Sequence, residues 1–139
     1  MVDYSNQPNE EDGMELKKQV CSAKLSNKIK KLGITTPSIF FREWTGAKDD
    51  EIEIWQNHKS YYGIDNVNCY TVAELGEMLP YRLGKTAYYL ECWKEIAGKW
   101  VIEYVHNDHR FSKQRFVEDT EANARAKCLI YLLEHNLLK

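Results

Sequence analysis

Residues 120–138 read TEANARAKCLIYLLEHNLL, and this stretch predicts the last element of the chain, an amphipathic helix. Thr120 is the expected N-cap, and the glutamate that follows it stands in the first turn, where a carboxylate interacts favourably with the helix dipole. Apolar residues recur at helical spacing and predict one buried stripe, with charged residues between them facing water. The stripe comprises Ala122, Ala126, Leu129, Ile130, Leu133 and Leu137, and the charged residues are Arg125, Lys127 and Glu134.

The stretch YTVAEL, which begins at Tyr70, predicts the start of a second helix. Thr71 and Glu74 have the spacing of a capping box, in which each side chain accepts a hydrogen bond from the backbone N–H of the other. Tyr70 and Leu75 occupy the positions of the hydrophobic staple that accompanies this motif. Pro80 ends the element, so the predicted helix is short.

Three strands are predicted between these two helices, at Thr86–Ile96, Trp100–Val105 and Phe111–Val117, with a tight turn at Ala97-Gly98-Lys99. Successive side chains of a strand point to opposite faces, so the sequence predicts two different surfaces. One face carries Tyr88, Leu90, Cys92, Trp100, Ile102 and Tyr104. The other face carries Tyr89, Glu91, Trp93, Val101, Glu103 and Val105.

The N-terminal half predicts one more helix, within about residues 15–32, where apolar residues recur every three or four positions. Gly33 is expected to stop it in the left-handed conformation that favours glycine. The segments Ser38–Trp44 and Glu51–Gln56 are rich in aromatic and β-branched residues and predict a β-hairpin. Residues 57–69 are interpreted as a loop.

These elements predict an α+β fold, an antiparallel β-sheet with helices packed on it, in the order α-β-β-α-β-β-β-α. Residues 1–13 are polar and acidic and are expected to form a disordered acidic tail. Residues 14–139 have the size of one structural unit and are expected to form a single α+β domain.

The composition of the chain excludes several classes of protein. The 139 residues carry 19 basic and 21 acidic side chains, whereas a dedicated binder of duplex nucleic acid has a clear positive excess. Four cysteines stand far apart and lack the short spacing of a zinc or redox motif. No signal peptide and no run of about 20 apolar residues is visible, so we expect a cytoplasmic protein without a membrane span.

The aromatic and acidic face of the predicted three-stranded sheet is the first candidate site. Tyr89, Glu91, Trp93 and Glu103 share this face, and tyrosine and tryptophan are favoured where proteins bind one another. The residues therefore predict contact with a ligand or a protein partner. The competing interpretation is that the N-terminal hairpin or the first helix covers this face.

The lysines of the first helix are the second candidate. Lys17, Lys24, Lys28 and Lys31 fall within one narrow stripe if the helix is continuous. Such a stripe can follow the phosphates of a nucleic acid. The competing interpretation is an ordinary solvated flank, whose aliphatic stems cover apolar surface.

A third candidate is the cluster His106-Asn107-Asp108-His109-Arg110. His106, Asp108 and His109 could ligate a metal ion in a metal-dependent enzyme, although a catalytic zinc site needs three rigidly held protein ligands. Asn, Asp and His are also common in turns, and this interpretation is favoured. No recognisable catalytic motif is present, so neither a catalytic residue nor a cofactor is assigned, and the sequence favours a protein that is not an enzyme.

Two resemblances accompany these patterns. Residues 71–138 follow the order α-β-β-β-α, which resembles that of a double-stranded-RNA-binding domain, but the start of the last helix is acidic where that family clamps phosphates with lysines. The segments Lys30–Ile34, Ser38–Phe41, Thr71–Pro80 and Glu121–Glu134 resemble a family of small hypothetical phage and prophage proteins of gut bacteria. This resemblance implies an origin in a mobile element and supplies no catalytic residue.

The leading expectation is therefore a phage-derived accessory protein that binds a protein, which could be a second copy of itself, through the aromatic sheet face. The alternative is a nucleic-acid-binding protein that uses the lysine stripe.

Overall fold

A computed structural model describes residues 15–43, 55–56, 66–106 and 112–138 of the chain. The expected acidic tail at 1–13, and Asp108 and His109, lie outside the described residues. The elements are α1 (Leu16–Gln19), α2 (Ala23–Lys31), β1 (Phe40–Glu43), β2 (Trp55–Gln56), β3 (Asn66–Asn68), α3 (Val72–Met78), β4 (Tyr88–Lys94), β5 (Trp100–His106), β6 (Ser112–Glu118) and α4 (Glu121–Glu134).

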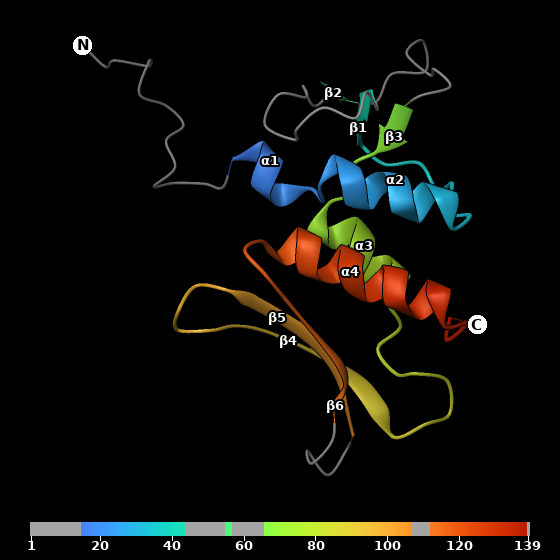
Figure 1. Ribbon diagram of the computed structural model, residues 1–139, viewed down its shortest axis with the longest axis vertical. Helices are drawn as coiled ribbons and strands as arrows, with labels where there is room; N and C mark the ends of the chain where they lie inside the picture. The colour runs from blue at the N-terminus through green and yellow to red at the C-terminus, as the bar shows by residue number, and fades with distance from the viewer. Residues whose placement is uncertain (1–14, 44–54, 57–65, 107–111, 139) are drawn as a thin grey trace.

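The α+β class and the antiparallel pairing of the strands are confirmed. The described strands form two three-stranded sheets, which we call the smaller sheet, in the order β2-β1-β3, and the larger sheet, β4-β5-β6, whose strands are longer. The larger sheet lies against α4, and α2 lies on the other side of α4, toward the smaller sheet (Figure 1). The order α3-β4-β5-β6-α4 follows the order expected for residues 71–138.

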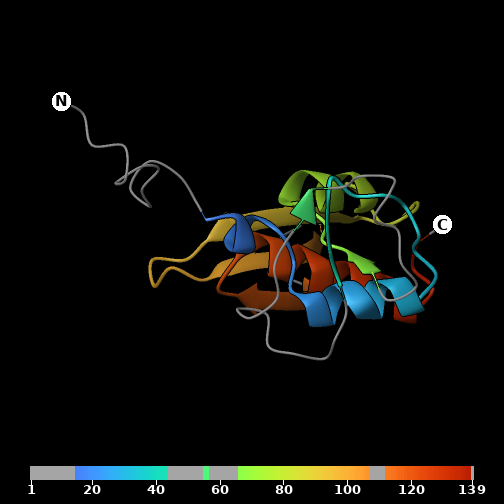
Figure 2. The same ribbon diagram turned by 90° about the horizontal axis from the view of Figure 1, so that it is seen from above.

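Helix α4 is the centre of the fold, and it is more deeply buried than one apolar stripe predicts. It contacts β5, β6, α1, α2 and α3, and the view along the perpendicular direction also shows it enclosed between these elements (Figure 2). Its buried residues span roughly two-thirds of the helix circumference at 100° per residue. They are Ala122, Ala124, Ala126, Cys128, Leu129, Ile130 and Leu132.

One charged residue of α4 does not face water as expected. The Arg125 side chain is only 16% exposed, and its Nε donates a hydrogen bond to Glu121 Oε2 at 2.8 Å. The two residues stand four apart on one side of the helix, where such ion pairs form readily. The prediction of a solvent-facing Arg125 was wrong, because the side of the helix that carries Arg125 lies against α3 at Gly76.

The predicted first helix is broken into α1 and α2 at Val20–Ser22. Val20 forms an isolated antiparallel bridge with Thr71, and the Cys21 N–H donates a hydrogen bond to the Tyr70 carbonyl at 3.0 Å. The Ser22 N–H donates to Asn123 Oδ1 at 2.8 Å, while the Ser22 hydroxyl caps α2. These tertiary partners override the helical periodicity of the segment.

The predicted end of α2 at a left-handed Gly33 is confirmed. Gly33 has φ +99°, and its N–H donates to the Lys30 carbonyl, while the Ile34 N–H donates to the Ile29 carbonyl at 3.3 Å. This pair of hydrogen bonds is the Schellman motif, which closes a helix through one left-handed residue.

Strand β3 of the smaller sheet shows that the prediction of a loop over residues 57–69 was wrong at residues 66–68. Asn66–Asn68 form β3, which pairs with β1 and was not expected as a strand. The predicted hairpin is present as the β1–β2 pair, with Phe41 opposite Trp55. The preceding residues of the second predicted strand, 51–54, lie outside the described residues.

Buried phenol and thiol groups make the fold sensitive to alkali. Burial raises the pKa of Tyr70 to about 12 and that of Cys128 to about 12, and it also raises the pKa of Tyr104. An unfolded chain loses these protons near their ordinary values of about 8.5 for Cys and 10 for Tyr. Because these pKa values are higher in the folded than in the unfolded chain, the neutral groups contribute their full stability at any pH below the unfolded pKa values. This contribution is lost as the pH rises toward about 12.

We therefore expect the free energy of unfolding, measured by urea denaturation, to fall between about pH 8 and about pH 11. Cys128→Ala and Tyr70→Phe remove the titrating groups and should each flatten this decline, whatever they do to the stability at about pH 8. Declines as steep in both variants as in the wild type would show that these groups do not carry the effect.

Candidate functional site

The pairing of β4 with β5 brings the aromatic and acidic residues together as predicted. Tyr89 lies opposite Val105, Glu91 opposite Glu103, and Trp93 opposite Val101. The alternate residues of both strands belong to the core that includes α4. The predicted residues therefore share the face that is turned away from α4, which we call the outer face (Figure 1).

Strand β6 adds an arginine to the outer face. Arg115 lies opposite Glu103 in the β5–β6 register, and its Nε is 3.1 Å from Glu103 Oε2. Its guanidinium carbon also lies 5.5 Å from the centroid of the Trp93 ring. Since Trp93 belongs to β4 and Arg115 to β6, this cation–π contact crosses the central strand β5.

The crossing contact explains why the middle of the outer face is inaccessible. Val101 is 0% exposed and Glu103 only 4%, although both point away from α4. A buried carboxylate needs a partner, and the Arg115 guanidinium, whose side chain is 55% exposed, supplies one for Glu103. Another protein that binds this face could therefore contact Arg115 but not the buried Glu103.

Tyr81 extends the outer face beyond the edge of β4. The Leu90 N–H donates to the Tyr81 carbonyl at 2.8 Å, and Arg82 forms an isolated bridge with Tyr89, so this segment runs beside β4. The Tyr81 ring stacks on the Tyr89 ring with centroids 6.0 Å apart, and Tyr81 remains 74% exposed. Val117, opposite Val101 in the register, is 40% exposed. We call Tyr81, Tyr89, Glu91, Trp93, Glu103, Arg115 and Val117 the outer-face cluster.

The competing interpretation, in which the first helix or the N-terminal hairpin covers this face, is wrong for the described residues. Helices α1 and α2 contact α4, and β1 lies beyond α2, on the side of α4 that is remote from the larger sheet (Figure 1). Tyr81, Arg115 and Val117 were not among the predicted site residues. The alternation along β6 could have suggested Arg115, whereas Tyr81 follows a proline and belongs to no predicted element.

The lysine stripe is divided between two helices. Lys17 belongs to α1 and forms an ion pair with Glu15 at 3.5 Å, while Lys24, Lys28 and Lys31 lie on α2. Because the chain turns at Val20–Ser22, a single helical projection does not relate Lys17 to the other three. Lys28 is 3.2 Å from Glu134 of α4, which offsets part of its charge. Nucleic-acid binding by this stripe stays a prediction.

The histidine cluster is described only at His106, which packs edge-on against Tyr88 with ring centroids 5.4 Å apart. Within the described ranges, no three His, Cys, Asp or Glu side chains are placed to hold a metal ion. Cys21, Cys69 and Cys128 are buried, and Cys92 is half-buried. Burial and the neighbouring Glu121 carboxylate raise the pKa of Cys92, which disfavours a reactive thiolate.

Comparisons with known proteins returned no match, whether against family models, curated proteins or solved structures. Among the described helices, none is both long and apolar enough to cross a membrane. The geometry of the outer face is therefore the main guide to function.

Proposed function

We propose that this chain is a cytoplasmic accessory protein of phage or prophage origin that acts by binding a protein through the outer-face cluster. The phage origin rests on the sequence resemblance. The binding role rests on one observation. Exposed Tyr81, which stacks on Tyr89, and exposed Arg115, which lies over half-buried Trp93, share a sheet face that carries no described helix. Tyrosine, tryptophan and arginine are the residue types that dominate binding energy in protein interfaces.

The partner that fits this face most directly is a second copy of the chain. The outer-face cluster carries both an arginine and acidic side chains, together with stacked aromatic rings. In a two-fold contact the same surface is used twice, so Arg115 of one copy can meet the half-buried Glu91 of the other. A face of a single charge would repel its own copy.

We expect sedimentation velocity to show a concentration-dependent dimer that Tyr81→Ala with Val117→Lys weakens at least about tenfold. Both residues are exposed, so the fold should be retained. Arg115 is left in place, because its removal would leave Glu103 buried without this cation. Ile39→Ala is the matched control, since Ile39 is 53% exposed and lies on the smaller-sheet side of the molecule.

Two results together would contradict the proposal. One is a wild-type chain that stays monomeric at every concentration. The other is a pull-down from host lysate in which the wild type and the double variant capture the same proteins. A dimer that dissociates equally in the double variant and in Ile39→Ala would place the interface elsewhere.

A further inference from the structure

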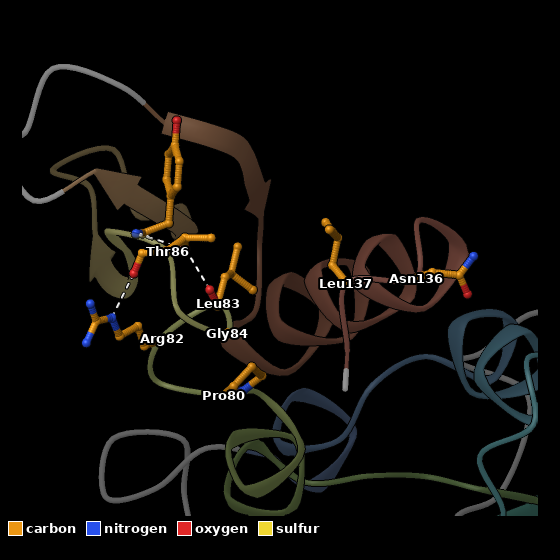
Figure 3. A pocket seen from close by; sticks show the side chains of 8 residues that line it. Pro80, Arg82, Leu83, Gly84, Thr86, Asn136 and Leu137 are labelled. Carbon is orange, nitrogen blue, oxygen red and sulfur yellow. Dashed lines mark hydrogen bonds between the residues drawn. The ribbon is translucent and has the colours of Figure 1, made fainter.

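The two edges of the larger sheet, β4 and β6, differ in what covers them. A turn closes the first part of the β4 edge, where the Leu83 N–H donates to the Tyr88 carbonyl at 3.0 Å. The turn is itself fixed by hydrogen bonds from the Thr86 hydroxyl to the Leu83 carbonyl and from Arg82 to the Thr86 carbonyl (Figure 3). Among the described elements, only β5 and α4 make extensive contact with β6, and no described strand pairs with its outer edge.

The alternation of hydrogen bonds across the larger sheet shows which backbone groups of β6 lie on that outer edge. In an antiparallel ladder, residues that exchange hydrogen bonds with one neighbouring strand alternate with residues whose N–H and C=O point the other way. The Glu95 N–H donates to the Lys99 carbonyl at 2.8 Å, and two positions further along each strand the register makes Trp93 and Val101 the next such pair. Tyr88, which bonds away from β5, fits the same alternation. The N–H and C=O groups of residues 100 and 102 in β5 therefore point to β6.

Arg115 and Val117 are the residues of β6 whose backbone groups face outward. Glu118 and Phe116 lie opposite residues 100 and 102, so these two bond to β5. The N–H and C=O groups of Arg115 and Val117 then point to the outer edge. The register is regular from residue 115 to residue 118, and both outward-facing residues also have exposed side chains. This part of β6 therefore offers a straight, accessible row of backbone donors and acceptors.

The side chains along this edge are self-complementary. Asp119 directly follows β6, and the register continued by one residue sets it beside Lys99, with which it forms an ion pair. Asp119 stays 82% exposed in this pair. If the β6 strands of two copies run antiparallel about Val117, each Val117 lies opposite its counterpart, and Arg115 of each copy lies opposite Asp119 of the other. Opposite charges and β-branched residues are favourable partners at such directly opposed positions.

We infer that two copies of the chain join their β6 strands edge to edge, antiparallel and centred on Val117, into one continuous sheet. The proposed self-association underlies this inference, but the contact lies at the edge of the larger sheet and not on its outer face. Backbone hydrogen bonds supply the affinity of such strand pairing, and the side chains select the register. The two-fold axis stands perpendicular to the sheet, so the outer faces of both copies lie side by side and stay accessible.

Hydrogen exchange of the ¹⁵N-labelled full-length chain, followed by NMR, tests the edge pairing residue by residue. The Arg115 and Val117 amides should exchange fast in dilute solution and at least about fivefold more slowly once the protein is concentrated enough to self-associate. The Phe116 and Glu118 amides, which bond to β5, should be protected at every concentration. Packing of two outer faces predicts no slowing at Arg115 and Val117, because it adds no backbone hydrogen bond to β6.

Asp119→Arg sets two cations opposite each other at both ends of the pairing and should weaken self-association at least about fivefold. The fold should be retained, because the ion pair of Asp119 with Lys99 is exposed. Glu95→Arg is the matched control, since it makes the same change of charge at an exposed position on the β4 side of the sheet. Tyr81→Ala alters only the outer face and should leave the protection of the Arg115 and Val117 amides unchanged.

Three outcomes would overturn the edge pairing. They are Arg115 and Val117 amides that exchange equally fast at every concentration, equal losses of protection in Asp119→Arg and Glu95→Arg, and a loss of protection in Tyr81→Ala. Self-association in which these amides stay fast would remove the edge pairing and leave the outer-face cluster as the contact. Protection that persists in Tyr81→Ala would support the edge pairing whether or not the outer-face cluster binds a protein.

Discussion

Leu129→Ala is expected to lower the free energy of unfolding by about 3–5 kcal/mol. Leu129 is 0% exposed and belongs to α4, the helix that contacts the larger sheet and the other helices. Removing its side chain loses the transfer free energy of the missing atoms and leaves a cavity. The surroundings cannot collapse easily into that cavity, because α4 is held on several sides at once.

Ile96→Ala is the matched control for this prediction. Ile96 stands at the β4–β5 turn and is fully exposed, so a similar loss of side-chain atoms should change the stability by less than about 0.5 kcal/mol. Urea denaturation of both variants gives the comparison. A loss of less than about 1 kcal/mol for Leu129→Ala would mean that α4 is not the centre of the core.

The sequence predicted α4 and its Leu and Ile stripe, but it could not predict that the helix is buried over most of its circumference. Part of the buried circumference lies outside the predicted stripe and includes Ala124 and Cys128. Small residues carry little hydrophobic signal, so their spacing does not distinguish a solvated face from one that lies close to another helix. Arg125, which is mostly covered and forms an ion pair with Glu121, also reads as a solvated residue in the sequence.

The outer face shows the same division between local and non-local information. Alternation along β4 and β5 is sufficient to place Tyr89, Glu91, Trp93 and Glu103 on one face, because every second side chain of a strand points to the same face of the sheet. Placing Arg115 requires the register of β6, and that register shifts between Glu103 and Val105. Tyr81 reaches the face through tertiary pairing beside β4, which no periodicity reveals.

The break between α1 and α2 and the short strand β3 have a related cause. Each depends on backbone groups that find partners far along the chain, such as Cys21 with Tyr70, or β3 with β1. Local propensity is a weak guide where such partners compete with it. By contrast, the Gly33 cap and the Thr71–Glu74 box are complete within a few residues, and both predictions were confirmed.

The Glu74 carboxylate links this local motif to the smaller sheet. Its Oε1 accepts hydrogen bonds from the Thr71 N–H at 2.8 Å and the Ser38 hydroxyl at 2.7 Å. Its Oε2 accepts a hydrogen bond from the Ile39 N–H at 3.0 Å. Ser38 and Ile39 directly precede β1, so one side chain both caps α3 and fixes the start of β1. The capping box was predictable from sequence, whereas the second role was not.

Glu74→Ala is therefore expected to lower the free energy of unfolding by about 2–3 kcal/mol. The variant loses the Glu74 half of the α3 capping box and two further hydrogen bonds to a charged acceptor, while the Thr71 hydroxyl still accepts from the backbone N–H of residue 74. The loss stays below the sum of the separate bonds, because the Ser38 hydroxyl also reaches the Cys69 carbonyl at 3.0 Å. In the variant, the Ile39 N–H can donate a hydrogen bond to water instead, because its position is exposed to solvent.

Hydrogen exchange separates the two roles of Glu74. In Glu74→Ala, the Ile39 and Cys69 amides should exchange faster by more than the global loss of stability explains, because the start of β1 is released locally. Glu77→Ala is the matched control, since Glu77 is an exposed glutamate of the same helix, and it should change the stability by less than about 0.5 kcal/mol. Glu74→Gln preserves one acceptor for the Thr71 N–H but replaces the second oxygen with a donor. It should therefore restore the hydrogen bond from the Thr71 N–H and leave exchange of the Ile39 amide fast. Slow exchange at Ile39 in this variant would show that Glu74 acts on α3 alone.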